Sequence, residues 1–137
     1  MLRTRKLDIY PFTIGYVDDQ KQYVNFCKRN NLHEGDGLLC AVDSSARFHS
    51  WGSPTRIGLI AVNPKNMRDP LAFVTGLIAH EVQHCWDWMY WTLGEHERGG
   101  REASAYLQGF MVRFCTQAYL DSMRERGWKL NHEAWEP

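Results

Sequence analysis

The sequence predicts one α+β domain with a small mixed sheet of about three to four strands. Its length of 137 residues is close to the commonest size of a single domain, so we treat residues 1–137 as one unit. Hydrophobic residues make up 44% and charged residues 23%, which is typical of a packed globular chain. Strand-like segments fill the first half and two long helical segments the second, an order that favours helices covering one face of the sheet.

Three segments of the first half favour strands. Residues 8–17 are rich in β-branched and aromatic residues, with Pro11 and Gly15 indicating an edge position or a bulge. Residues 38–42 form a second candidate after a loop at 33–37. The run 56–62, which is apolar after Arg56, is the clearest strand and is ended by an Asn-Pro pair. Between the first two, Asp18 and Asp19 offer N-caps for a short helix that reaches about residue 30.

Two long helices follow. Asp69 is a good N-cap and Pro70 fits a first helical turn, so we expect a helix over about 70–93, ended by Gly94 in a left-handed conformation. After a charged turn at 95–100, a last helix begins near residue 101. Its apolar stripe consists of Leu107, Phe110, Met111, Phe114 and Ala118, which predicts that the two helices pack together.

The pattern His80-Glu-Val-Gln-His84 carries the candidate chemistry. Two imidazoles at positions i and i+4 lie one above the other on a helix, so they can hold one Zn²⁺ ion at two corners of a tetrahedron. Glu81 lies beside the metal rather than on it. From there its carboxylate can take a proton from zinc-bound water and pass it to a leaving amine.

A third protein ligand has several candidates. Glu102 is the choice, because the 18 residues after His84 let the chain reverse and present a carboxylate from the next helix. Asp87 lies on the same helix face, but an unbroken helix carries it past the metal, so it is a hydrogen-bond acceptor or a solvated charge. Glu95, His96 and Glu97 in the turn are further options. Tyr106, four residues after Glu102, is a catalytic candidate as an oxyanion donor, or a packing tyrosine.

These residues resemble a known class of enzymes. His80-Glu-Val-Gln-His84 followed by Glu102-Ala-Ser-Ala-Tyr-Leu107 is similar to the gluzincin metallopeptidases, and nearest to small gluzincin-like proteins encoded by bacteriophages. A looser similarity links the chain to peptidases that cleave prophage repressors, although it lacks their Leu-Met-Pro continuation. The resemblance implies a zincin fold, with His80, His84 and Glu102 as zinc ligands and Glu81 as general base. It also implies that residues 56–62, or the strand next to them, pair with an extended substrate.

Other residues of these types have plainer interpretations. Trp86, Trp88, Tyr90 and Trp91 are too many for one buried face, so we expect most in the core and some exposed. Cys85 is read as a small core residue. His33, His49 and His132 are expected in loops or the tail, with solvated polar roles.

The sequence therefore predicts a zinc metallopeptidase that acts on a peptide or protein. The alternative is a metal-stabilised binding or regulatory protein in which the same ligands join two helices. Iron, cobalt or nickel would also fit the ligand set. With 16 basic and 16 acidic residues the net charge is zero, which disfavours nucleic acid as a partner, and we expect neither a membrane span nor a signal peptide, hence a cytoplasmic protein.

Overall fold

The computed structural model describes residues 1–8, 10–94 and 101–130, apart from the side chains of residues 67, 68 and 101–103. This part of the chain is α+β, as expected, with a four-stranded mixed sheet and three α-helices. The elements in order are β1 (Leu2–Lys6), β2 (Thr13–Val17), α1 (Gln20–Arg29), β3 (Ala46–Trp51), β4 (Ile57–Val62), the 3₁₀ turn η1 (Pro64–Arg68), α2 (Leu71–Leu93) and α3 (Arg101–Glu125).

The sheet has the order β1-β2-β4-β3, so β4 is an interior strand and β3 lies at an edge. β2 and β4 run parallel, and the two outer strands are antiparallel to their neighbours. All six residues of β4 are buried, which explains the uninterrupted apolar run that predicted it.

Three strands differ from the prediction, and one of them, β1, lies at residues 2–6, where no strand was expected. The expected strand at 38–42 is wrong: Leu39 is buried in irregular chain, where the Gln20 side chain accepts a hydrogen bond from its N–H. The strand lies instead at Ala46–Trp51, paired with β4. β2 covers only the second half of the predicted segment 8–17. It is paired on both sides, so Gly15 marks neither an edge nor a bulge.

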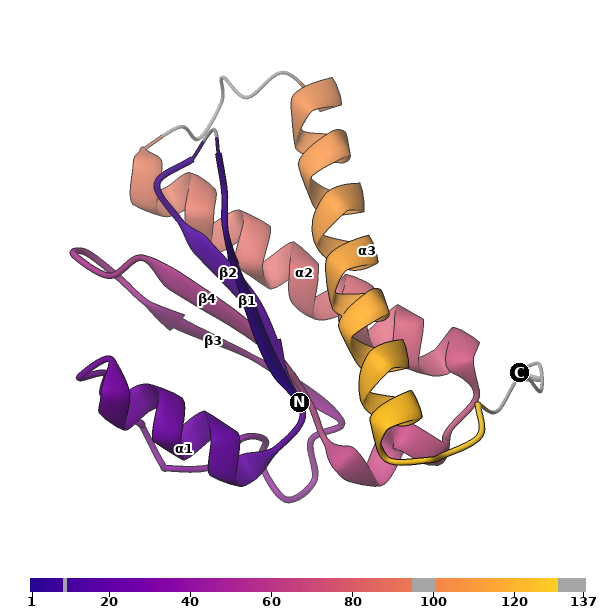
Figure 1. Ribbon diagram of the computed structural model, residues 1–137. Helices are drawn as coiled ribbons and strands as arrows, with labels where there is room; N and C mark the ends of the chain where they lie inside the picture. The colour runs from indigo at the N-terminus through magenta and orange to yellow at the C-terminus, as the bar shows by residue number, and fades with distance from the viewer. Residues whose placement is uncertain (9, 95–100, 131–137) are drawn as a thin grey trace.

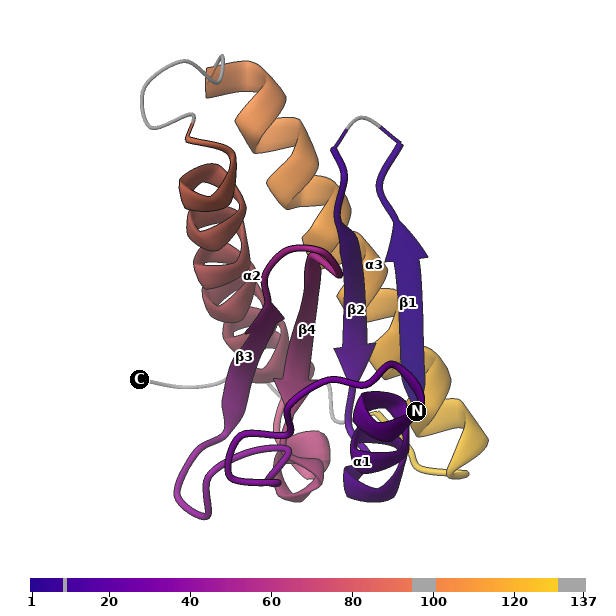
Figure 2. The same ribbon diagram turned by 90° about the vertical axis from the view of Figure 1, so that its left-hand side faces the viewer.

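The helices lie on both faces of the sheet. α2 and α3 cover one face and α1 the other, so the expectation of helices on one face holds for the two long helices only (Figures 1 and 2). Asp19 caps α1 as predicted, with its side chain accepting from Gln22 N at 2.8 Å. Gly94 ends α2 at φ 68° as predicted, but Asp69 caps the end of η1, and α2 begins after Pro70 without a side-chain cap.

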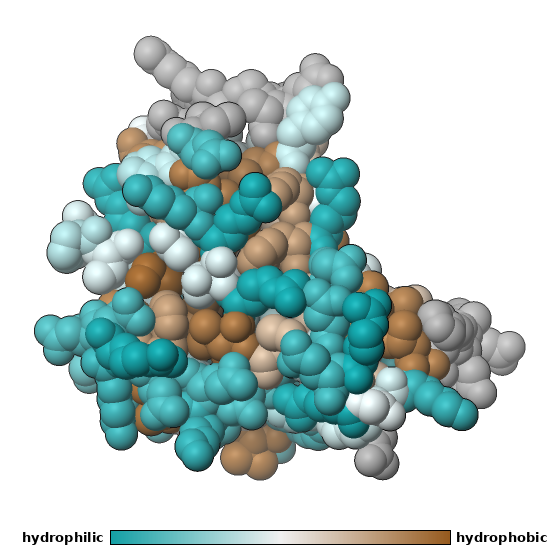
Figure 3. Space-filling view, viewed as in Figure 1, coloured by the Kyte–Doolittle hydropathy of each residue, from teal (hydrophilic) through white to brown (hydrophobic). Residues whose placement is uncertain are grey.

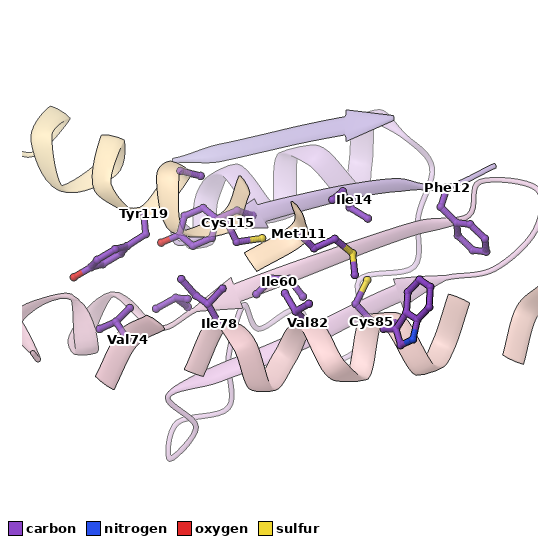
Figure 4. Close-up of a cluster of buried hydrophobic side chains, with 14 of the residues drawn as sticks. Phe12, Ile14, Ile60, Val74, Ile78, Val82, Cys85, Met111, Cys115 and Tyr119 are labelled. Carbon is purple, nitrogen blue, oxygen red and sulfur yellow. The ribbon is translucent and has the colours of Figure 1, made fainter. Parts of the chain in front are cut away.

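α2 and α3 pack antiparallel over the sheet. Along the cluster of buried side chains in Figure 4, Val74, Ile78 and Val82 of α2 lie opposite three side chains of α3, in the order Tyr119, Cys115 and Met111. This packing fixes which face of α2 is buried and which remains outside.

The outer surface is mixed. Hydrophilic residues cover most of the face that shows α1 and α3, and hydrophobic residues show between them (Figure 3). Within the described residues, no helix is both long enough and apolar enough to cross a membrane.

Candidate metal centre

The structure brings His80 and His84 together on the outer side of α2. Both side chains are exposed, whereas the buried side of the helix carries Val74, Ile78, Val82 and Cys85. The two Nε2 atoms lie 3.1 Å apart, and the ring planes meet at 82°. The helical turn between positions i and i+4 produces this approach without any help from the rest of the fold.

The spacing fits two ligands of one ion. Two nitrogens about 2.0–2.1 Å from Zn²⁺ at a tetrahedral angle lie about 3.3 Å apart, close to the distance between these two nitrogens. In the described part of the chain, however, no group of three His, Cys, Asp or Glu side chains is placed to hold a metal ion. The pair therefore fits two corners of a zinc site, and a third ligand is not among the described side chains.

Glu81 lies in a groove that His80 also lines. The groove has a volume of about 690 Å³, and Glu81 is only 9% exposed in it. One wall is the N-terminal half of α2, and the other is the segment that leads into β3. Its remaining lining residues are Ser44, Ser45, Ala46, Ala72, Phe73, Gly76 and Leu77.

Two asparagines hold the β3 wall of this groove in place. The Asn63 side chain donates to Ser44 O and the Asn66 side chain to Ser45 O, each at 3.0 Å. Because β4 is anchored against the core, these bonds set the distance between the start of β3 and α2.

Within the described part of the chain, β3 has one edge beside the groove that no other strand pairs with. Asn63 N donates to Ser45 O at 2.9 Å, so residue 45 bonds to β4, and the alternation of an antiparallel ladder turns residues 46, 48 and 50 the other way. The N–H and C=O groups of Phe48 and Ser50 therefore point outward from the sheet. β4 has no such edge, because β2 and β3 pair with it on both sides.

Glu102 is not placed as a ligand by the described residues. Its backbone is in the first turn of α3, and its side chain lies outside the described part. In Figure 4, Met111 of α3 lies opposite Val82 of α2. Because the helices are antiparallel, the first turn of α3 lies level with the last turns of α2, about 10 Å along the helix beyond His84. Figure 1 shows it standing clear of α2. Ligation by Glu102 requires this turn to approach the histidines, and it stays a prediction. Glu95, His96 and Glu97 also lie outside the described residues.

Tyr106 lies elsewhere. It is 71% exposed and lines a different groove, of about 460 Å³, together with Arg5 and Lys6 of β1 and Phe110 of α3. The structure does not bring it into the groove of Glu81. Asp87 accepts a hydrogen bond from the Gln83 side chain at 2.9 Å and is exposed.

The aromatic residues and Cys85 follow the expectation. Trp86 and Cys85 are buried, whereas Trp91 is 72% exposed. Near Glu81, burial and then the Glu81 charge raise the pKa of the Cys40 thiol to about 11, against the lowering effect of Arg47 and Lys65. Cys40 is therefore a neutral thiol at physiological pH when no metal ion is bound.

Sequence reasoning missed the wall of the groove and misplaced one histidine. No strand was predicted between residues 42 and 56, and only the alternation of Ala46, Phe48 and Ser50 could have indicated β3. His49, expected in a loop, is buried in β3, whereas His33 is exposed as expected and His132 lies outside the described residues. Comparison with family models, curated proteins and solved structures finds no match to the chain.

Proposed function

We propose that this protein is a zinc-dependent peptide hydrolase. One observation carries the proposal: the imidazole nitrogens of His80 and His84 lie 3.1 Å apart, and His80 lines the same groove as the nearly buried Glu81. Ion-binding nitrogens and a proton-accepting carboxylate are the groups that hydrolysis by activated water requires.

His80 and His84 would hold the ion, and Glu102 remains the expected third ligand. Zinc bound there would supply a Lewis acid that polarises a peptide carbonyl and lowers the pKa of water. Their Nε2 atoms already have about the spacing of neighbouring ligands, and an ion bound there would replace the hydrogen bond that now joins them, with loss of its proton.

Glu81 would act as the general base. It is only 9% exposed and lines the groove together with His80 and Ala46. A carboxylate in this place can accept a proton from the attacking water and deliver it to the nitrogen that leaves. The proposal assigns no step to Tyr106, because that side chain lines the other groove.

β3 would hold the substrate. An extended peptide can add to its free edge through the N–H and C=O groups of Phe48 and Ser50. Phe48 contacts Trp88 of α2 with ring centroids 5.8 Å apart, so a strand added here passes close to α2 and its histidines. The predicted strand 56–62 is β4, which is paired on both sides, whereas its neighbour β3 lies at an edge of the described sheet.

The replacement of Glu81 by Gln tests the proposal. We expect Glu81→Gln to lower the hydrolysis of an unfolded protein substrate by about 10²–10⁴-fold while zinc content, measured by atomic absorption, stays the same. Glu125→Gln, the same change at an exposed place on α3, should leave both unchanged. A zinc-loaded wild-type protein that cleaves no peptide, or a Glu81→Gln variant that is as active as wild type, would refute it.

The alternative is a structural metal in a binding protein. Both described ligands lie on the single helix α2, so an ion held by them alone would join no two elements. The alternative therefore depends entirely on a ligand from another element. It predicts that zinc removal unfolds the protein and that Glu81→Gln changes no function.

A further inference from the structure

A second pocket lies beside the same edge strand, on the opposite face of the sheet. It has a volume of about 300 Å³ and is lined by Tyr23 of α1, by residues 33–35 and by residues 47–51 of β3. Side chains alternate between the faces of a strand, so Arg47, His49 and Trp51 point into this pocket while Phe48 faces α2. This β3 pocket and the candidate metal centre thus flank one free edge from its two sides.

Aromatic rings form one wall of the β3 pocket. The rings of Tyr23 and His49 have centroids 4.7 Å apart, and those of His49 and Trp51 are stacked at 6.1 Å with planes 12° apart. The Trp51 indole donates to His33 O at 2.8 Å, which fixes the orientation of its ring. Tyr23 and His49 are buried beneath this wall, so Trp51 supplies the aromatic face that a ligand can reach.

The charges of the pocket lining leave one carboxylate uncompensated. Arg47 is neutralised by Asp36, whose two oxygens accept from it at 3.1 and 2.9 Å. Burial lowers the pKa of His49, so this imidazole is neutral at physiological pH. Among the residues that the structure describes, the Glu34 side chain accepts no hydrogen bond and pairs with no cation.

We propose that the β3 pocket binds the basic side chain, above all an arginine, of a peptide that lies along β3. A guanidinium is planar and stacks on aromatic faces, and it pairs with a carboxylate through parallel hydrogen bonds. The pocket offers both partners: the stacked wall that ends at Trp51, and Glu34. A neutral side chain would leave the Glu34 carboxylate without a counter-charge.

The position of the pocket fixes the spacing in the peptide. A strand added to β3 turns alternate side chains to the two faces of the sheet. The basic side chain faces α1, so it is an odd number of residues away from any side chain that faces α2 and the histidines. The position of the basic side chain relative to the histidines has meaning only if the proposed hydrolysis is correct. Binding of the basic side chain in the β3 pocket does not depend on that proposal.

Binding of matched peptides tests the inference. The probes are a blocked Ala-Arg-Ala peptide and its citrulline counterpart, which keeps the shape of the side chain and removes the charge. The Trp51 indole N–H resonance, assigned by its loss in Trp51→Phe, reports binding to the full chain in NMR titrations. We expect the arginine peptide to bind about tenfold more tightly than the citrulline peptide.

Two variants separate the pocket from the catalytic groove. Glu34→Gln should reduce arginine binding to the level of citrulline, while Glu125→Gln, a matched loss of one exposed charge, should change nothing. The inference is overturned if the two peptides bind equally to the wild-type protein, if neither binds at millimolar concentration, or if Glu34→Gln leaves their ratio unchanged. Binding is measured on the Glu81→Gln protein as well. If the zinc-loaded wild-type protein hydrolyses no peptide but keeps the arginine preference, the proposed function alone is refuted.

Discussion

At the scale of single residues, the environment gives histidine different roles in this protein. His80 and His84 are exposed and adjacent, so their nitrogens are available to an ion. His49 is 8% exposed, with Nε2 2.6 Å from Leu39 O and Nδ1 3.3 Å from the Tyr23 hydroxyl. Its two nitrogens join β3 to α1 and to the segment before β3, which makes it a structural residue.

His49 predicts a dependence of stability on pH. Burial lowers its pKa in the folded protein, although the bond to Leu39 O opposes this effect. Below about pH 6.5 the unfolded chain takes up a proton at His49 that the folded protein resists, so the free energy of unfolding should fall as the pH falls. Urea unfolding between pH 5 and 8 in the presence of a chelator should show this slope, and His49→Gln should flatten it. The exposed His33→Gln is the control, and equal slopes in both variants would contradict the assignment.

At the scale of elements, close approach between strands determines where a glycine is needed. Gly15 pairs with Thr4 of β1 and with Leu59 of β4 in the middle of the sheet. A Cβ atom there would lie 2.5 Å from Leu59 Cδ2 and 2.8 Å from Arg3 O. Gly76, on the exposed part of α2, has nothing within 4 Å of the same position.

These two glycines predict opposite effects of alanine. Gly15→Ala should destabilise the protein by about 1–3 kcal/mol, because backbone and side chain must move to admit the methyl group. Gly76→Ala should stabilise it by about 0.5–1 kcal/mol through the better helix propensity of alanine. Urea denaturation measures both free energies. A Gly15→Ala variant at least as stable as wild type would show that the approach of β1 and β4 to Gly15 is not as tight as described.

At the scale of the whole molecule, three layers position the candidate site. The sheet holds β3 in place through β4, and the packing of α2 against α3 and the sheet orients the helix so that His80 and His84 stay outside. At the far end of the sheet, the buried carboxylate of Asp18 accepts from Tyr16 and Arg126, which ties β2 to the chain that follows α3. The groove is thus bounded by elements that belong to one core.

Zinc should stabilise this assembly if the ion binds the folded chain alone. Free zinc at about 100 times its dissociation constant adds about 2.7 kcal/mol to the free energy of unfolding. We expect a higher Tm with zinc, a return to the lower value with a chelator, and no zinc effect in His80→Ala. Glu102→Gln should weaken the zinc effect if this carboxylate is the third ligand. An equal rise of Tm in His80→Ala would place the bound zinc elsewhere.

The sequence by itself determined the features that depend on neighbours along the chain. The i, i+4 spacing places His80 beside His84 in any α-helix, the Asp19 cap starts α1, and Gly94 ends α2. β4 was equally evident, because a strand covered on both faces is apolar throughout. The reason is that helical periodicity, capping and burial on both faces leave their marks within a few consecutive residues.

Only the tertiary structure decided which strands form and what lies beside the histidines. β1 is mostly charged and exposed, and it becomes a strand because β2 offers it a partner. β3 forms by pairing with β4, and that pairing brings Ser44–Ala46 to Glu81 and leaves the free edge on which both proposed binding sites depend. Strand pairing is a contact between distant parts of the chain, and local residue patterns do not specify it.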